Sequence, residues 1–150
     1  MTVSDPSSPT VAPGRDAVHP AVGYAGDVTP ELAAHWMASG QAVLVDVRSD
    51  AEREWVGYVP GGVGLAWKQW PGMALNAGFD DGLKAAVAPG AKVVMLCRSG
   101  VRSIAAAKRA TELGVEAYNI LEGFEGNPDE QGHRGQQGGW RFRGLPWKQN

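Results

Sequence analysis

Short, wholly apolar segments that alternate with helix-forming segments limit most strongly how this chain can fold. Residues 42–46 (Ala-Val-Leu-Val-Asp) and 92–96 (Lys-Val-Val-Met-Leu) lack the polar–apolar alternation of a half-exposed strand. Uninterrupted apolar runs of this length are typical of strands that are buried on both faces of a parallel sheet. We therefore expect an α/β fold of three layers, with a central, mostly parallel β-sheet flanked by helices.

Capping residues, Gly and Pro set the limits of the other expected elements. Thr29 is the expected N-cap of the first helix, and Gly114 is expected to end the last one. Helices are predicted at 30–39, 50–55, 79–88 and 102–113, and strands at 42–46, 63–67, 92–96 and 115–121. A long loop follows at 122–139, and four apolar residues after it are expected to anchor the chain end to the domain: Trp140, Phe142, Leu145 and Trp147.

The 150 residues indicate one domain. Residues 1–22 are rich in Ser, Pro, Thr and Ala without apolar periodicity, which predicts a disordered N-terminal tail followed by a folded domain at 23–150. The net charge of -2 gives no reason to expect nucleic acid or a membrane as partner. Neither a membrane-spanning run nor a secretory signal is evident, so a cytoplasmic protein is expected. The single cysteine excludes an internal disulfide and sites built from several thiolates, and no cofactor or metal is expected.

That cysteine, Cys97, follows the apolar run 92–96 and precedes the predicted helix 102–113. A tight loop in this position directs backbone N–H groups inward at the positive end of the helix, which favours the thiolate. Arg98 and Arg102 carry positive charge at any biological pH and can bind an oxyanion. These features suit a nucleophile that attacks an anionic substrate, although a buried structural cysteine is the alternative.

Polar residues also end the strand at 42–46. Asp46 and Arg48 lie at its carboxyl end, the edge of a parallel sheet where sites form. Two interpretations remain open at this stage. These side chains take a direct part in a site, or Asp46 caps the next turn while Arg48 pairs with a neighbouring acid.

The loop Cys97–Arg102 resembles the active-site loop of rhodanese sulfurtransferases, and the likeness extends over about residues 23–147. Each supporting segment is weak alone, but their order and spacing are specific: 42–48, 57–62, 121–123, 138–140 and 144–146. Tyr58 stands where the family commonly has histidine. The closing segment is interrupted by about a dozen residues, which predicts a loop insertion near 127–137 that forms a lid or a partner surface.

The resemblance implies a rhodanese fold and an enzyme that moves a sulfane sulfur from thiosulfate, or a similar small anionic donor, to a thiol or cyanide acceptor. Cys97 would carry this sulfur as a persulfide. The backbone of six loop residues would hold the persulfide: Arg98, Ser99, Gly100, Val101, Arg102 and Ser103. The resemblance further implies that Arg98 and Arg102 bind the anionic end of the donor, and that Asp46 and Arg48 support the loop.

Two other functions compete with sulfur transfer. Related phosphatases and arsenate reductases have five residues between the cysteine and the arginine, whereas four separate Cys97 from Arg102 here. The shorter loop favours a sulfur atom over a tetrahedral oxyanion. A non-catalytic binding module is less favoured because the cysteine and both arginines are present. The sequence leaves open whether Trp140 and Trp147 pack within one chain or across a homodimer.

Overall fold

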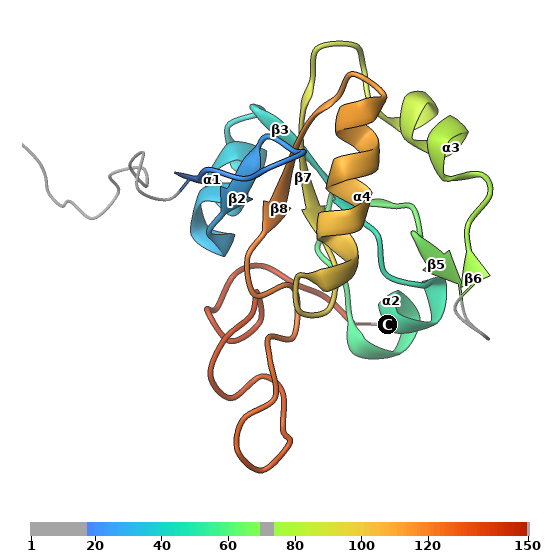
Figure 1. Cartoon of the computed structure of the whole chain (residues 1–150). Coiled ribbons are helices and arrows are strands. Elements are labelled where there is room, and N and C mark those ends of the chain that lie inside the picture. Colours follow the sequence, from blue (N-terminus) through green and yellow to red (C-terminus); the bar gives the residue numbers. More distant parts are fainter. Residues whose placement is uncertain (1–17, 70–73, 150) are drawn as a thin grey trace, which may run out of the picture.

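The fold is built on one six-stranded sheet. The structure, a computed structural model, describes residues 18–69 and 74–149 of the chain. The strand order is β1-β2-β8-β7-β3-β4, in which only β1 and β2 pair antiparallel (Figure 1). Its strands are β1 (Val18–His19), β2 (Gly26–Val28), β3 (Ala42–Asp46), β4 (Val63–Gly64), β7 (Lys92–Leu96) and β8 (Glu116–Ile120). A separate antiparallel pair consists of β5 (Lys68–Gln69) and β6 (Ala74–Leu75).

The two apolar runs form the centre of the sheet as predicted. β3 and β7 pair in parallel along their full length, with Asp46 opposite Leu96. Their carboxyl ends therefore meet at one edge, so the residues after β3 lie beside the loop after β7. The predicted α/β architecture with a mostly parallel sheet is confirmed.

Four helices accompany the sheet in the described residues: α1 (Pro30–Ala38), α2 (Asp50–Val56), α3 (Phe79–Ala86) and α4 (Val101–Glu112). Thr29 caps α1 as predicted, because its side chain accepts a hydrogen bond from the Leu32 N–H at 3.1 Å. Ser49 and Glu52 form a reciprocal capping box at the start of α2. These local signals explain why α1 and α2 begin where the sequence predicts.

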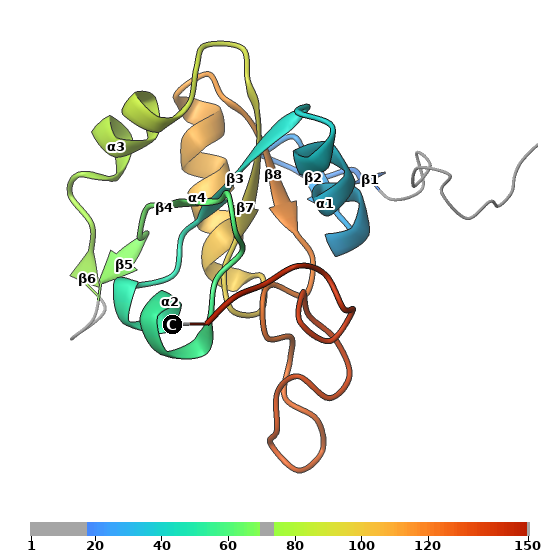
Figure 2. The same ribbon diagram turned by 180° about the vertical axis from the view of Figure 1, so that it is seen from behind.

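The helices divide the core into two layers. α3 and α4 cover one face of the sheet and α1 covers the other, as the two opposite views show (Figures 1 and 2). Side chains of β7 alternate between these layers, so that Met95 and Cys97 face α4 while Leu96 faces α1. Three fully buried alanines let α4 approach the sheet closely: Ala106, Ala107 and Ala110. The cysteine thus lies on the face of the sheet that α4 covers.

Several short elements differ from the prediction. The strand expected at 63–67 contains only Val63–Gly64, and β2, β5 and β6 were not predicted. The predicted tail at 1–22 is too long at its end, because Val18–His19 pairs with β2, while its first 17 residues lie outside the described part of the chain. These strands are two or three residues long, and such segments are too short to show a hydrophobic period.

The chain end returns to the domain through three of the four predicted anchors. Trp140 is 1 % exposed, its indole N–H donates to the Pro146 carbonyl at 2.8 Å, and Leu145 packs on the same core. Trp147 packs edge-on against Phe124, whereas Phe142 is 50 % exposed. The segment near 127–137 projects from the body of the domain (Figures 1 and 2). Among the described helices, none has the length and apolar character needed to cross a membrane.

Candidate active site

The loop that begins at Cys97 joins β7 to α4 in a single tight turn. Gly100 occupies the N-cap position of α4 with a φ of 108°, a left-handed conformation that favours glycine. This turn brings the Gly100 N–H to within 3.1 Å of the Cys97 sulfur. The predicted arrangement of a thiol at the positive end of a helix is therefore present in the structure.

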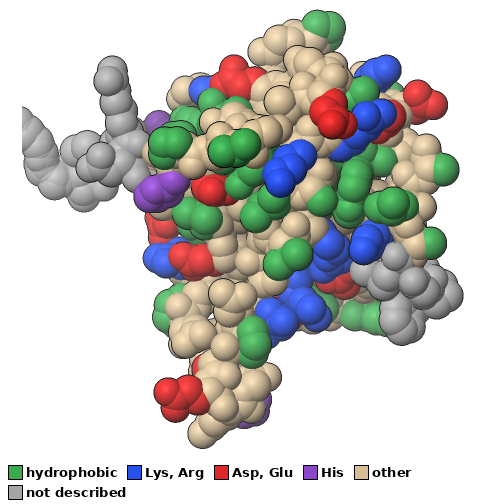
Figure 3. Space-filling view, in the orientation of Figure 1, with side chains coloured by type: hydrophobic (Ala, Val, Ile, Leu, Met, Phe, Trp, Pro, Cys, Tyr) green, Lys and Arg blue, Asp and Glu red, His purple; other side chains and the backbone are tan. Residues whose placement is uncertain are grey.

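The thiol is buried, with Cys97 1 % exposed. Its sulfur also lies 3.2 Å from the Ser103 hydroxyl, which comes from the first turn of α4. The other loop residues differ in exposure: Gly100 and Ser103 are buried, Ser99 and Arg102 are partly buried, and Arg98 and Val101 are exposed. Basic side chains gather over α4 and around its N-terminal end (Figure 3).

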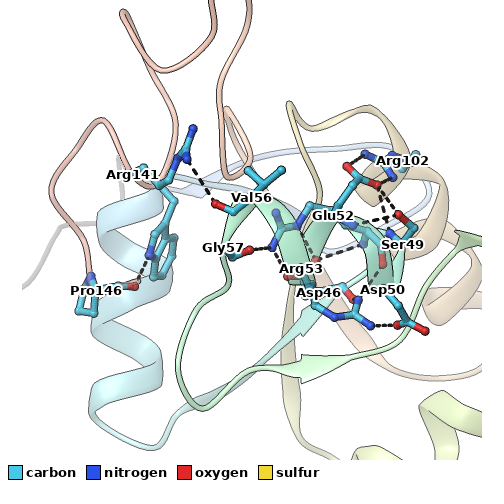
Figure 4. Close-up of polar contacts among 12 residues, drawn as sticks. Asp46, Ser49, Asp50, Glu52, Arg53, Val56, Gly57, Arg102, Arg141 and Pro146 are labelled. Carbon is cyan, nitrogen blue, oxygen red and sulfur yellow. Dashed lines mark hydrogen bonds and ion pairs between the residues drawn. The ribbon is translucent and has the colours of Figure 1, made fainter. Parts of the chain in front are cut away.

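Arg102 is held by an acidic side chain that the sequence did not single out. Its two terminal nitrogens donate to the two oxygens of Glu52 at 2.6 and 2.8 Å, and these side chains point toward each other in Figure 4. Burial alone would raise the pKa of Glu52, but the hydrogen bonds and charge of Arg102, with help from Ser49, lower it to about 2. The same hydrogen bonds raise the pKa of Arg102 against the opposing effect of burial.

A pocket of about 500 Å³ opens beside this ion pair. Its lining combines the two arginines of the loop with residues of α2, with the α2 N-cap Ser49 and with Glu125 from the segment after β8: Ser49, Ala51, Glu52, Trp55, Val56, Arg98, Arg102 and Glu125. Trp55 is 69 % exposed at this pocket. An anionic ligand that entered it would meet Arg98 directly and Arg102 together with its partner Glu52.

Asp46 and Arg48 form a buried ion pair at the end of β3. The Arg48 guanidinium donates to the Asp46 carboxylate at 2.9 and 2.7 Å and to the Gly57 carbonyl at 2.8 Å. The Cζ atom of Arg48 lies over the Phe124 ring, 4.3 Å from its centroid. Of the two interpretations left open, the pairing of Arg48 with a neighbouring acid matches this geometry, and that acid is Asp46 itself.

The segment after β8 holds the cysteine loop in place through backbone hydrogen bonds. The Phe124 N–H donates to the Cys97 carbonyl at 2.8 Å, and the Glu125 N–H donates to the Arg98 carbonyl at 3.0 Å. Gly123 permits this contact, because a Cβ there would lie 2.5 Å from the Arg98 carbonyl and its φ is +65°. In the sequence, Gly123 stands out only as part of a family motif, and nothing there reveals its close contact with the cysteine loop.

A polar chain that sequence reasoning also missed lies behind the thiol. The Ser103 hydroxyl donates to the Asn119 side chain of β8, whose amide in turn donates to Asp27 of β2. The three histidines lie elsewhere: His19 is in β1, His35 is in α1 and His133 is in the projecting segment. The groups that the structure gathers around the thiol are therefore the loop, the arginines and this polar chain.

Comparison with known families places this fold and loop in one class. Residues 29–127 match the rhodanese-like domain, which is more than half of the chain. The chain belongs to the rhodanese-like domain family. The resemblance stated from the sequence is thus confirmed for the family and for the fold.

Individual relatives agree with this assignment. The crystal structure of Rv0390 from M. tuberculosis superposes with a TM-score of 0.76 at 46% identity, covering 85% of this chain and 99% of that one. The uncharacterized protein RC0915 of Rickettsia conorii is 35% identical over 117 residues, 75% of this chain and 87% of the relative. A rhodanese-related protein from Thermoplasma volcanium shares the fold at 17% identity, with a TM-score of 0.56 and coverage of 81% and 96%.

Proposed function

We propose that this protein is a sulfurtransferase in which Cys97 carries the transferred sulfur as a persulfide. The Cys97 thiolate attacks the outer sulfur of thiosulfate or a similar donor. The S–S bond of the donor breaks, and its electron pair leaves with sulfite. A thiol or cyanide then attacks the persulfide sulfur, takes it away and regenerates the thiolate.

The observation that carries this proposal is the cradle around the sulfur atom. Four residues separate Cys97 from Arg102, and within this short turn the Gly100 N–H lies 3.1 Å from the sulfur. The N-terminus of α4 and the nearby Arg102 add positive potential. Such a cradle stabilises a negatively charged sulfur, which is the nucleophile before transfer and the persulfide after it.

Arg98 and Arg102 are the proposed ligands of the donor's anionic end. Arg98 is exposed and available to a small anion. Arg102 uses one N–H of each terminal nitrogen for Glu52. Because a guanidinium has five N–H donors, Arg102 keeps further donors with which to bind a sulfonate oxygen.

Asp46 and Arg48 are proposed to support the loop without touching the donor. Asp46 holds Arg48 over the ring of Phe124, and the backbone N–H of Phe124 donates to the Cys97 carbonyl. We also propose that the protein acts in the cytoplasm, where a single cysteine stays reduced between turnovers. Two further predictions are untested: that the insertion near 127–137 forms a lid or a partner surface, and that the protein forms a homodimer.

Steady-state kinetics with thiosulfate and cyanide test the proposal. The wild type should form thiocyanate with the parallel-line pattern of a double-displacement reaction, and Cys97→Ser should form none. Arg102→Ala should weaken donor binding by about 1.5–3 kcal/mol, the value of one charged hydrogen-bonded contact. An unchanged Michaelis constant and turnover in that variant would refute the role of Arg102.

The same preparations distinguish the competing functions. Release of phosphate from an aryl phosphate, without thiocyanate formation from thiosulfate, would establish the phosphatase alternative and overturn the proposal. Absence of both activities, together with no sulfur uptake by Cys97 from any sulfane donor, would favour the non-catalytic binding module.

A further inference from the structure

A continuous chain of hydrogen bonds runs from the thiol to β2, along the face of the sheet that α4 covers. The Cys97 sulfur lies 3.2 Å from the Ser103 hydroxyl oxygen, and that hydroxyl donates to Asn119 Oδ1 at 2.5 Å. Asn119 Nδ2 donates to Asp27 Oδ1 at 2.9 Å, and the Tyr24 hydroxyl donates to the same oxygen at 2.8 Å. Ser103 and Asn119 are at most 1 % exposed, so water cannot substitute freely for either partner.

Counting protons fixes the direction of this chain. The carboxylate of Asp27 can only accept hydrogen bonds, so the Asn119 side chain must turn its amide nitrogen toward Asp27. Its carbonyl oxygen therefore faces Ser103 and needs a donor. A serine hydroxyl has one proton, and here that proton is used for Asn119.

The direction of these hydrogen bonds affects the ionisation of the Cys97 sulfur. With its proton given to Asn119, Ser103 can only accept from Cys97, and only the protonated thiol can donate. Loss of the thiol proton would oblige the hydroxyl to turn toward the sulfur, which would leave the buried Asn119 oxygen without a donor. An unsatisfied buried acceptor is costly, so this chain opposes formation of the thiolate.

We infer that Asp27 and Asn119 are positioning residues that oppose ionisation of Cys97, by directing the Ser103 hydroxyl away from the sulfur. The inference rests on the proposed role of Cys97 as the sulfur-carrying nucleophile. It assigns to residues of β2 and β8 an effect on how readily that nucleophile forms. The Gly100 N–H and Arg102 favour the thiolate, and the Ser103 chain works against them.

Other charged groups lie on the elements around the loop. They are Asp46 and Arg48 after β3, Glu52 of α2, and Arg98 and Arg102 of the loop and α4. None of them changes in the variants below. Differences between those variants therefore report on the chain behind the sulfur.

The test is a pH titration of the thiolate by its ultraviolet absorbance, which needs no access to the buried sulfur. Each scan is corrected with the same variant carrying Cys97→Ser, which removes the only cysteine of the chain. In Asp27→Asn, the new amide can accept as well as donate, so Asn119 can turn over and donate to Ser103. The midpoint should then fall by about one pH unit, the effect of one hydrogen bond to a charged group.

A double-mutant cycle separates this route from a direct effect of charge. The shift caused by Asp27→Asn should vanish in a Ser103→Ala background, because the effect passes through that hydroxyl. Asn119→Ala frees the Ser103 proton by a second route and should lower the midpoint as well. Asp80→Asn, which removes the same charge where Asp80 pairs with Arg109 in the last turn of α4, is the matched control and should leave the midpoint unchanged.

Two outcomes overturn the inference. The first is a midpoint in Asp27→Asn that stays the same or rises. The second is a fall that persists in the Ser103→Ala background, which would mean that charge acts on the sulfur directly. Because the titration needs no substrate, it also separates this inference from the proposed function. If the titration midpoint shifts as expected but Cys97 accepts no sulfur, only the proposed function is refuted. If Cys97 accepts sulfur but the midpoint does not shift, only this inference is refuted.

Discussion

Replacing Glu52 with Gln should destabilise the protein in a manner that depends on pH. The substitution keeps the shape of the side chain and preserves the capping box with Ser49, because Gln serves at that position as well as Glu. What it removes is the charge that faces Arg102 across contacts of 2.6 and 2.8 Å. The change therefore isolates the ion pair between α2 and the cysteine loop.

The structure sets the size of the expected loss. Depression of the Glu52 pKa from its ordinary 4.5 to about 2 corresponds to an upper value of about 3 kcal/mol. The two side chains are 21% and 16% exposed, so solvent screening reduces this to about 1–2 kcal/mol. Because the folded-state pKa is lowered, this stability is fully present above pH 4.5 and is lost as the pH falls through 4.5 toward about 2.

Urea denaturation of wild type and Glu52→Gln at several pH values measures this effect. The variant should be less stable by about 1–2 kcal/mol near neutral pH, and the difference should shrink toward zero near about pH 2–3. A difference of the same size at every pH would show that packing, and not charge, accounts for the loss. That result would refute the assignment of the lowered pKa to Arg102.

Four further substitutions, one of them a control, test other parts of the account. Gly123→Ala should lower stability by about 2 kcal/mol or more, because a Cβ there would lie 2.5 Å from the Arg98 carbonyl, and it should impair sulfur uptake by Cys97; normal denaturation and uptake would exclude a role for this close contact. Trp140→Ala should cost about 3–5 kcal/mol in thermal or urea unfolding, whereas the half-exposed Phe142→Ala should stay within about 0.5 kcal/mol; equal losses would contradict the assigned anchoring. Thr29→Ala should cost about 1 kcal/mol through loss of the α1 cap, and an unchanged urea midpoint would show that this cap contributes nothing.

The centre of the fold was predictable because its signals are local. The runs that became β3 and β7 are too apolar for any place but a buried parallel sheet, and Thr29 and Gly114 mark helix ends by their own chemistry. The edge strand β1 carries no such signal. Its two residues are extended because β2 lies beside them, and sequence alone does not reveal that neighbour.

The candidate site likewise combines local features, which the sequence predicts, with contacts between distant residues, which it does not. The loop from Cys97 to Arg102 is contiguous in sequence, so its turn and its place at a helix end could be predicted. Glu52 lies 50 residues from its partner Arg102, and Asp27 lies 92 residues from Asn119. Such contacts can be predicted only when the strand order is known. For this reason the sequence suggested anion binding by Arg102 but did not reveal that Glu52 holds its side chain.

The central claim is that Cys97 accepts a sulfane sulfur, and intact mass spectrometry after incubation with thiosulfate tests it most directly. The wild type should gain the mass of one sulfur atom, lose it again on addition of cyanide or a thiol, and show no gain as Cys97→Ser. A wild type whose mass does not change would contradict thiosulfate as donor. An equal gain in Cys97→Ser would contradict the claim that this cysteine carries the sulfur.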